Sequence, residues 1–510
     1  MKGGARMTVT PGFAFATNPD LEPLEIGEAE VRSAYRMDLP HHLGSTHNCK
    51  RNCRANPSCI SGLGERSWLE AEEEEESDGE LEDEMVRKTG VPAGLRNLGN
   101  TCYVNSFLQI WFHNLQFRAA MYQWDPSEDP VEAENETILE QLYEPRSKVA
   151  SLQVLFAMMQ YTKRKFIDPA DFITKLGLNP SVQQDAQEFS KLFISLLEDS
   201  LAHQSSAPVR TMIQKQFRGE YAYVTTCQAC LRESVRPSHF YELDLALAGG
   251  NKTIADCLKD FLKVERMTGD EKYFCEGCQC KQEASRCCRL RELPNTLNLQ
   301  LNRFQYDMNL GRKKKLNSNI QFPETLDMSE YLGPGQEAIY CLTGVLMHVG
   351  PDANHGHYIA HIQELDSGLW FKFSDETVVP LASKQLRLGG EEELLLAKKG
   401  KVKAPAVKSG VQNSNNAYML VYMLQDSLKE TRAAEEEEKM KREAVMKAEV
   451  AGRAEGGEPE DKRMKLGQDY SSEYTYSNCR VFPANFPQHL RTKMERDNLE
   501  FDEVGLSLEC

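Results

Sequence analysis

The stretch Gly94-Leu-Arg-Asn-Leu-Gly-Asn-Thr-Cys102 runs directly into Tyr-Val-Asn-Ser-Phe-Leu-Gln109, and the two pieces differ in character. The first is rich in glycine and asparagine, which favour turns and loops. The second begins an apolar pattern that recurs about every 3.6 residues, as on one face of a helix. Its apolar members are Val104, Phe107, Leu108, Trp111 and Leu115. The pattern predicts a buried helix that begins at Cys102.

A cysteine at the start of a helix has the chemistry of a nucleophile. The positive end of the helix dipole and the free N–H groups stabilise a thiolate, so we expect the pKa of Cys102 to fall from about 8.5 towards neutrality. Gly94 and Gly99 let the backbone approach a substrate closely, and the amide of Asn97 can face an oxyanion beside the sulfur. The alternative is a small core residue, the commoner use of a single buried cysteine.

A general base for this thiol is offered by the stretch Asn354-His-Gly-His-Tyr-Ile-Ala-His-Ile362. The turn Asp366-Ser-Gly368 and the strand Leu369-Trp-Phe-Lys-Phe373 follow it, which predicts a β-hairpin. In that hairpin His357 lies opposite a position near Asp375, to within one residue, so the carboxylate can orient the imidazole. A turn residue is the alternative for Asp375, and a hydrogen-bonded structural histidine is the alternative for each of His348, His355, His357 and His361.

These stretches together resemble the two signature sequences of the ubiquitin-specific proteases. The first signature corresponds to Gly94–Gln109 and the second to Gly356-His-Tyr-Ile-Ala-His361. The resemblance covers residues 94–424, and its further matches are Gln183-Gln-Asp-Ala-Gln-Glu-Phe189, Leu299-Gln-Leu-Asn-Arg-Phe304, Tyr340 to Gly350 and Asn416-Ala-Tyr-Met-Leu-Val-Tyr422.

The resemblance implies a papain-like cysteine protease with thumb, palm and zinc-bearing fingers subdomains, in which the helical half is the thumb. It implies hydrolysis of the isopeptide or peptide bond after the C-terminal glycine of ubiquitin. The implied partners are ubiquitin and ubiquitinated proteins, and no catalytic cofactor is needed. By position, Cys102 is the nucleophile, Asn97 the oxyanion donor and His357 the general base.

The same resemblance places three substrate-binding residues. Gln183 and Asp185, at a helix that begins near Gln184, correspond to residues that hold the extended C-terminal tail of ubiquitin, and Tyr358 lines the same channel. A carboxylate suits the arginines of that tail. The alternative for Asp185 is a charge that complements the helix dipole.

The sequence departs from the family pattern after Phe373, where the family usually has Asp or Asn and this chain has Ser374. A hydroxyl can accept a hydrogen bond from the His357 ring but adds no charge to stabilise imidazolium, so the third catalytic role is open between Ser374 and Asp375. We expect reduced but retained activity. The alternative is an inactive ubiquitin-binding scaffold with the same fold.

Two Cys-x-x-Cys pairs, Cys227-Gln-Ala-Cys230 and Cys275-Glu-Gly-Cys278, each follow a strand-like segment. Four thiolates at such spacing are typical of a tetrahedral structural zinc site. The strands between the pairs have little core, so a metal would stabilise them. The alternatives are a pair without metal and a different fourth ligand, because further cysteines lie nearby at Cys280, Cys287 and Cys288.

Changes in composition and apolar periodicity along the sequence divide the chain into four parts. Residues 1–68 form an extension whose Cys49, Cys53 and Cys59 hint at a further metal site, and residues 69–90 form an acidic linker. Residues 91–424 form the catalytic domain, helical at first and then rich in strands, which is an α+β pattern. Residues 425–510 comprise a charged helix over Thr431–Ala454 and a largely disordered tail.

Net charge and hydrophobicity exclude some classes of protein. The net charge of −17 argues against a general nucleic-acid binder, and no apolar run is long enough to span a membrane. Without a secretory signal we expect a cytosolic or nuclear protein, in which the 15 cysteines stay reduced. A zinc-ribbon module that binds nucleic acid through Arg312–Lys315 and Lys398–Lys408 is the alternative from another class. The sequence indicates no oligomeric state.

Overall fold

The computed structural model describes residues 85–139, 143–182, 184–247, 250–308, 311–350, 356–365, 367–381, 386–390, 410–434, 436–437, 440, 482–483 and 486–508. They belong to one compact unit, Met85–Cys510. The predicted N-terminal extension, its cysteines and most of the acidic linker lie outside the described residues. Among the helices described, none combines the length and the apolar character that a membrane crossing requires.

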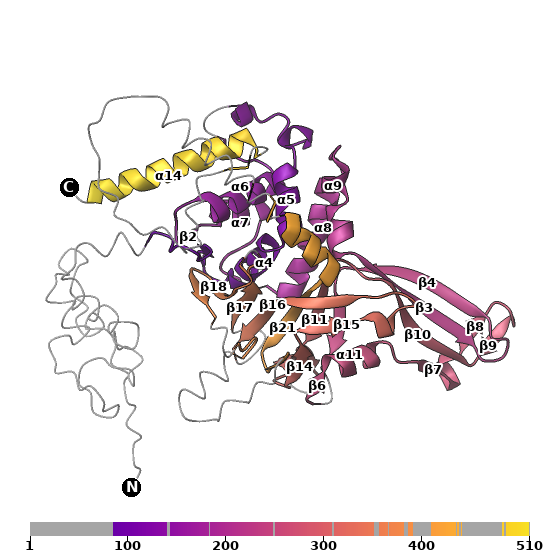
Figure 1. Cartoon of the computed structure of the whole chain (residues 1–510). Coiled ribbons are helices and arrows are strands. Elements are labelled where there is room, and N and C mark those ends of the chain that lie inside the picture. Colours follow the sequence, from indigo (N-terminus) through magenta and orange to yellow (C-terminus); the bar gives the residue numbers. More distant parts are fainter. Residues whose placement is uncertain are drawn as a thin grey trace, which may run out of the picture. The chain divides into compact units, whose positions relative to one another are not determined.

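A helical lobe occupies the first part of the unit, as the sequence predicts (Figure 1). Side chains cap several of its helices: Asn114 accepts from the Phe117 N–H at the start of α5, and Ser147 does the same for the Ala150 N–H at α6. The helices are α4 (Cys102–Phe112), α5 (Leu115–Gln123), α6 (Lys148–Tyr161), α7 (Ala170–Leu176), α8 (Ala186–Leu201), α9 (Ala207–Arg210) and α10 (Met212–Phe217).

A central sheet follows, with strand order β19-β18-β17-β16-β21-β11-β5, and β15 also pairs with β16. Its pairs are antiparallel except for β5 with β11, which is parallel. The strands are β5 (Leu243–Ala246), β11 (Thr296–Asn302), β15 (Thr325–Asp327), β16 (Ile339–Val349), β17 (His357–Gln363), β18 (Trp370–Ser374), β19 (Thr377–Pro380) and β21 (Ala417–Leu424). The α+β class and the hairpin after His357 are thereby confirmed.

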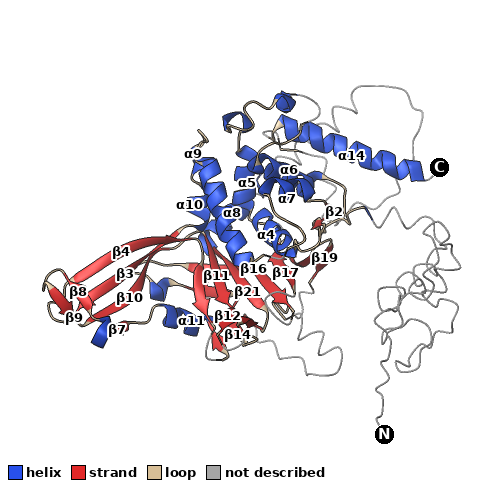
Figure 2. Cartoon of the chain, turned by 180° about the vertical axis from the view of Figure 1, so that it is seen from behind, coloured by secondary structure: helices blue, strands red, loops and turns tan. Residues whose placement is uncertain are grey.

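Apolar side chains cover both faces of this sheet. One face packs on the helical lobe through residues such as Ala360, Phe371 and Val421 (Figure 2). The other face forms a second core with α11 (Ile254–Phe261) and β14 (Ile320–Pro323). Burial on both faces explains why β21 consists almost entirely of apolar residues rather than alternating ones. Strand β14 also pairs with β6 (Lys252–Thr253) and β20 (Val411–Ser414).

A thin four-stranded sheet projects from the central sheet, and we call it the arm (Figures 1 and 2). Its order is β4-β3-β10-β7, with the short pair β8-β9 at its tip. Most residues of β4 are exposed, so the arm has little apolar core of its own. Its strands are β3 (Gly219–Cys227), β4 (Glu233–Phe240), β7 (Glu265–Met267), β8 (Tyr273–Cys275), β9 (Cys280–Gln282) and β10 (Ala284–Glu292).

The C-terminal part contains a helix that the sequence does not reveal. Helix α14 (Gln488–Leu508) packs on α6, where Phe486, Leu490 and Met494 join a small core with Tyr143 and other residues of the helical lobe. For these residues the expectation of a disordered tail is wrong, because three well-spaced apolar side chains suffice to anchor a mostly polar helix. Of the predicted charged helix over Thr431–Ala454, residues 431–434, 436–437 and 440 are described, and all of them are helical.

Small elements complete the described part. They are the parallel pair β1 (Gly94–Leu95) and β2 (Phe166–Ile167), the hairpin β12 (Phe304–Asp307) and β13 (Arg312–Lys315), and the 3-10 turns Pro126–Glu128, Glu136–Leu139, Gly269–Glu271 and Ser329–Tyr331.

Candidate active site

Cys102 is the first residue of α4, and only 4% of it is exposed. Every residue of α4 is buried, because the helix lies between the rest of the helical lobe and strands β17 and β18. The backbone N–H of Tyr358 in β17 donates to the Cys102 sulfur at 3.5 Å. The predicted buried helix is confirmed, and β17 brings the neighbouring His357 to the sulfur across the interface.

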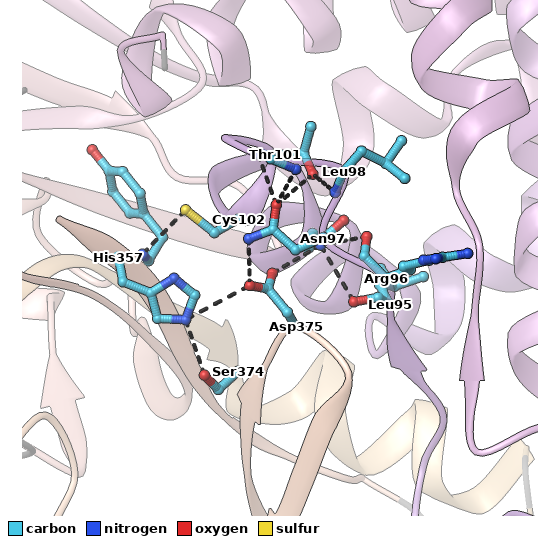
Figure 3. Close-up of polar contacts among 12 residues, drawn as sticks. Leu95, Arg96, Asn97, Leu98, Thr101, Cys102, His357, Ser374 and Asp375 are labelled. Atoms are coloured by element: carbon cyan, nitrogen blue, oxygen red, sulfur yellow. Dashed lines mark hydrogen bonds and ion pairs between the residues drawn. The ribbon is translucent and has the colours of Figure 1, made fainter. Parts of the chain in front are cut away.

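His357 opens β17 and contacts the end of β18. Its Nε2 lies 3.0 Å from Oγ of Ser374 and 3.7 Å from Oδ2 of Asp375. Figure 3 shows the ring between the Cys102 sulfur and these two residues, with the second ring nitrogen on the side of the sulfur. No hydrogen bond links the described side chains of Cys102 and His357. A proton on Nε2, donated to Ser374, leaves the other nitrogen free to accept a proton from the thiol.

Asp375 follows β18 and has a φ of 50°, a left-handed conformation that costs free energy in residues other than glycine. Its side chain accepts two amide hydrogen bonds of 2.8 Å, from Asn97 Nδ2 to Oδ2 and from Asn105 Nδ2 to Oδ1. Its carbonyl accepts from the Leu95 N–H at 2.9 Å. These bonds hold the carboxylate beside His357 (Figure 3).

The loop that precedes Cys102 is fixed by Asn97. Its side-chain oxygen accepts from the Gly99 N–H at 2.9 Å and from the hydroxyl of Thr101 at 3.2 Å. One amide hydrogen of Asn97 goes to Asp375, so the predicted role as oxyanion donor would use the second, and that role remains a prediction. The absence of a side chain at Gly94 lets the turn at Asp375 pack closely against it, because a Cβ there would lie 2.5 Å from the Glu376 carbonyl oxygen.

Burial changes the expected acidity of Cys102, the predicted nucleophile. It raises the pKa of the Cys102 thiol above its ordinary value, and the negative charge of Asp375 acts in the same direction. The N–H groups of Tyr358 and Tyr103 lower the pKa, but less than burial raises it. The predicted fall in pKa is therefore wrong for the free protein, because desolvation of the thiolate outweighs the helix start.

The predicted substrate-binding residues are placed as follows. Asp185 caps α8 by accepting from the Gln187 N–H at 3.0 Å, and it also contacts Tyr418 Oη at 3.2 Å and Lys313 Nζ at 3.2 Å. Tyr358 is 1% exposed, and its ring packs edge-on against Tyr418. Its predicted place in an open channel remains a prediction. Gln183 lies outside the described residues.

The basic stretch Arg312–Lys315 is strand β13 rather than a free loop. Lys315 is buried and donates to the carbonyl oxygens of His348 at 2.7 Å and Gly350 at 2.9 Å. Lys313 pairs with Asp185 at 3.2 Å. Two of these cations are thus engaged within the chain, whereas Lys398–Lys408 lies outside the described residues.

The four predicted zinc ligands gather at the tip of the arm. The sulfur atoms of Cys227, Cys230, Cys275 and Cys278 all lie within 4.8 Å of one another. The Cys230–Cys275 and Cys227–Cys278 separations are 3.6 and 4.0 Å. Sulfur atoms about 2.3 Å from a common tetrahedral zinc lie roughly 3.8 Å apart, so this cluster has the dimensions of a metal site.

The two halves of the cluster share one backbone feature. The residue after the second cysteine of each pair adopts a left-handed conformation, Leu231 with a φ of 60° and Gln279 with a φ of 54°. Two matching departures from ordinary backbone geometry indicate two equivalent knuckles, each shaped to turn its cysteines inward.

The family model for ubiquitin carboxyl-terminal hydrolase matches residues 93–422. The chain belongs to the ubiquitin carboxyl-terminal hydrolase family. The match contains the Cys102–His357 site, the arm and the central sheet except for the last two residues of β21.

Several members of this family are similar over most of the chain. Ubiquitin carboxyl-terminal hydrolase 48 of Gallus gallus is 48% identical, over 79% of this chain and 39% of the relative. The protein of the same name from Danio rerio is 44% identical, over 79% and 38%. Ubiquitin carboxyl-terminal hydrolase 26 of Oryza sativa subsp. japonica is 38% identical, over 70% and 32%. The chain thus matches less than half the length of these curated relatives.

Within this family member, sequence reasoning missed Asn105. It lies three residues after Cys102, so both occupy neighbouring positions on one side of α4. The helical period places Asn105 about 100° from the centre of the apolar face, so the periodicity gave no signal for its burial.

Proposed function

We propose that this chain is a deubiquitinating cysteine protease that hydrolyses the bond after the C-terminal glycine of ubiquitin. The observation that carries the proposal is the meeting of Cys102 and His357, which the fold brings together from a helix start and a strand start, with Ser374 and Asp375 behind the imidazole. Family membership supports the same substrate class.

In the proposed mechanism His357 takes the proton of the Cys102 thiol as the sulfur attacks the glycine carbonyl carbon. The tetrahedral oxyanion accepts a hydrogen bond from the free amide hydrogen of Asn97 and from backbone N–H groups at the start of α4. His357 then protonates the departing amine, the acyl-enzyme forms, and water activated by the same imidazole releases ubiquitin. Because burial raises the pKa of the Cys102 thiol, the proposed mechanism couples proton transfer to the attack of the sulfur.

Asp185 is the proposed anchor for the ubiquitin tail. Asp185 already pairs with Lys313, whose side chain is exposed. A substrate arginine would therefore displace this lysine from the carboxylate. Gln183 and Tyr358 are the other proposed contacts. Of the two candidates for the third catalytic role, Ser374 supplies the hydrogen bond to His357 and Asp375 supplies the charge.

The four-cysteine cluster is proposed to hold a structural zinc ion. Its four side chains are cysteine thiols, the ligands of closed structural zinc sites. They connect β3 to the β8-β9 pair in an arm that has little apolar core. Bound zinc would fix the arm; no step of the reaction passes through it.

A ubiquitin that carries a C-terminal electrophile tests the proposal. The wild-type protein should form a covalent adduct, and Cys102→Ala should form none. Equal labelling of both proteins rules out Cys102 as the nucleophile. Binding of ubiquitin without any adduct favours the second candidate function, an inactive scaffold, for which the absence of a family-type Asp or Asn at position 374 is the supporting observation.

A further inference from the structure

Asn105 is an almost fully buried amide beside the proposed catalytic residues, with 1% of its surface exposed. Its Nδ2 donates to Asp375 Oδ1 at 2.8 Å, to the Arg96 carbonyl at 3.1 Å and to the Leu95 carbonyl at 3.4 Å. All of these neighbours are acceptors, which fixes the nitrogen on this side of the amide.

We infer that Asn105 is a positioning residue, which fixes the Asp375 carboxylate against His357 from the same helix that carries the nucleophile. This inference rests on the proposed function. Asn105 lies one helical turn beyond Cys102, so α4 sets the distance between the sulfur and the carboxylate that faces the base.

The conformation of Asp375 shows why such a device is needed. Its φ of 50° lies in the left-handed region, which residues other than glycine populate sparsely, so the hydrogen bonds of Asp375 help to hold this turn. Asn97 and Asn105 each bind one carboxylate oxygen, and together they set the plane of the carboxylate. That plane directs Oδ2 towards Nε2 of His357 at 3.7 Å. With Asn97 alone the carboxylate can rotate about its remaining hydrogen bond.

The α4 helix provides a matched control in Gln109. It is also a buried amide, 2% exposed, and its Nε2 donates to the Ala93 carbonyl at 2.9 Å. Among the hydrogen bonds of the described residues, none joins Gln109 to Asp375. Asn105→Ala and Gln109→Ala therefore remove comparable buried amides from one helix, and only the first removes a bond to the carboxylate.

The experiment measures hydrolysis of ubiquitin with a fluorogenic C-terminal amide. Asn105→Ala should lower kcat roughly 10- to 100-fold, as expected when a group that orients a reacting side chain is lost. KM should change less than about threefold, since no tail contact is removed. Gln109→Ala should retain most of kcat. Equal losses in the two variants, at matched melting temperatures, overturn the inference.

A double-mutant cycle with Asp375→Ala separates positioning from general stability. If Asn105 acts through the carboxylate, adding Asn105→Ala to Asp375→Ala lowers kcat by less than about twofold. An undiminished loss on that background overturns the inference. Should Asn105→Ala not fold, Asn105→Leu, which keeps the branching of the side chain at Cγ, replaces it in the cycle. A wild-type protein with no hydrolysis refutes the proposed function instead, and the two failures are therefore distinct.

Discussion

Nε2 of His357 lies 3.0 Å from Oγ of Ser374, so a hydroxyl occupies the hydrogen-bonding position beside the proposed base. A hydroxyl can hold the ring in one orientation, but it does not balance the charge of imidazolium. The charge is supplied by a different residue, Asp375, whose Oδ2 lies at a longer distance of 3.7 Å. We therefore propose that orientation and charge compensation are divided between these two neighbouring side chains.

This division predicts unequal effects of mutation. Asp375→Asn should lower kcat roughly 100-fold, because the imidazolium formed during attack loses its nearby negative charge. Ser374→Ala should lower kcat only about tenfold or less, since Asp375 remains. Steady-state hydrolysis of a ubiquitin amide measures both. A larger loss for Ser374→Ala contradicts the division, and Ser374→Asp, which restores the family residue, should raise kcat.

The acidity of Cys102 predicts how the free protein reacts with small alkylating agents. Burial raises the pKa of this thiol, so at neutral pH a smaller fraction is thiolate than in an ordinary cysteine. Alkylation by iodoacetamide should be slow at pH 7 and should still rise above about pH 8.5, the ordinary thiol value. Mass spectrometry of the Cys102 peptide across a pH series measures the rate, and a plateau reached below pH 7 contradicts the prediction.

Metal content tests the cluster at the tip of the arm. The protein should contain one zinc ion per chain, and Cys278→Ser should lose it along with thermal stability, because the arm has few other contacts to fix its tip. Cys280→Ser is the matched control, since Cys280 is exposed and lies outside the cluster. Elemental analysis measures the zinc content of each variant. Equal zinc loss in both variants contradicts the assignment of Cys278 as the fourth ligand.

Helix α14 predicts a contribution of the C-terminal region to stability. Leu490 and Met494 are fully buried against the helical lobe, and Leu490→Ala or Met494→Ala should each lower the free energy of unfolding by about 2–4 kcal/mol. Leu499 on the same helix is 62% exposed, so Leu499→Ala should change it by less than about 0.5 kcal/mol. Denaturant unfolding compares the three variants, and equal effects contradict the docking.

The elements that the sequence predicts correctly are those that depend on residues close together in the chain. The apolar period after Cys102 and the hairpin after His357 depend on residues close together in the chain, and both elements form where expected. The cysteine pairs are likewise local motifs, and the fold brings them together.

Long-range contacts account for the rest. Asn105 meets Asp375 across a separation of 270 residues, and no local pattern records that contact. The pKa direction of Cys102 depends on how closely β17 covers the thiol, which packing determines. Lys315 belongs to a basic run that suggests a solvated surface, yet three oxygen atoms of other segments surround its ammonium group.

Helix α14 makes two ion pairs with the segment that leads into strand β2. Lys163 pairs with Asp502 at 2.5 Å and Arg164 with Asp497 at 3.0 Å, directly before strand β2. Strand β2 pairs with β1, whose Leu95 N–H holds the Asp375 turn. A protein trimmed to the family segment 93–422 therefore loses support for the strand pair beneath its own active site. We expect the trimmed protein to be less active than the longer chain. A shortened protein for activity measurements should therefore include α14.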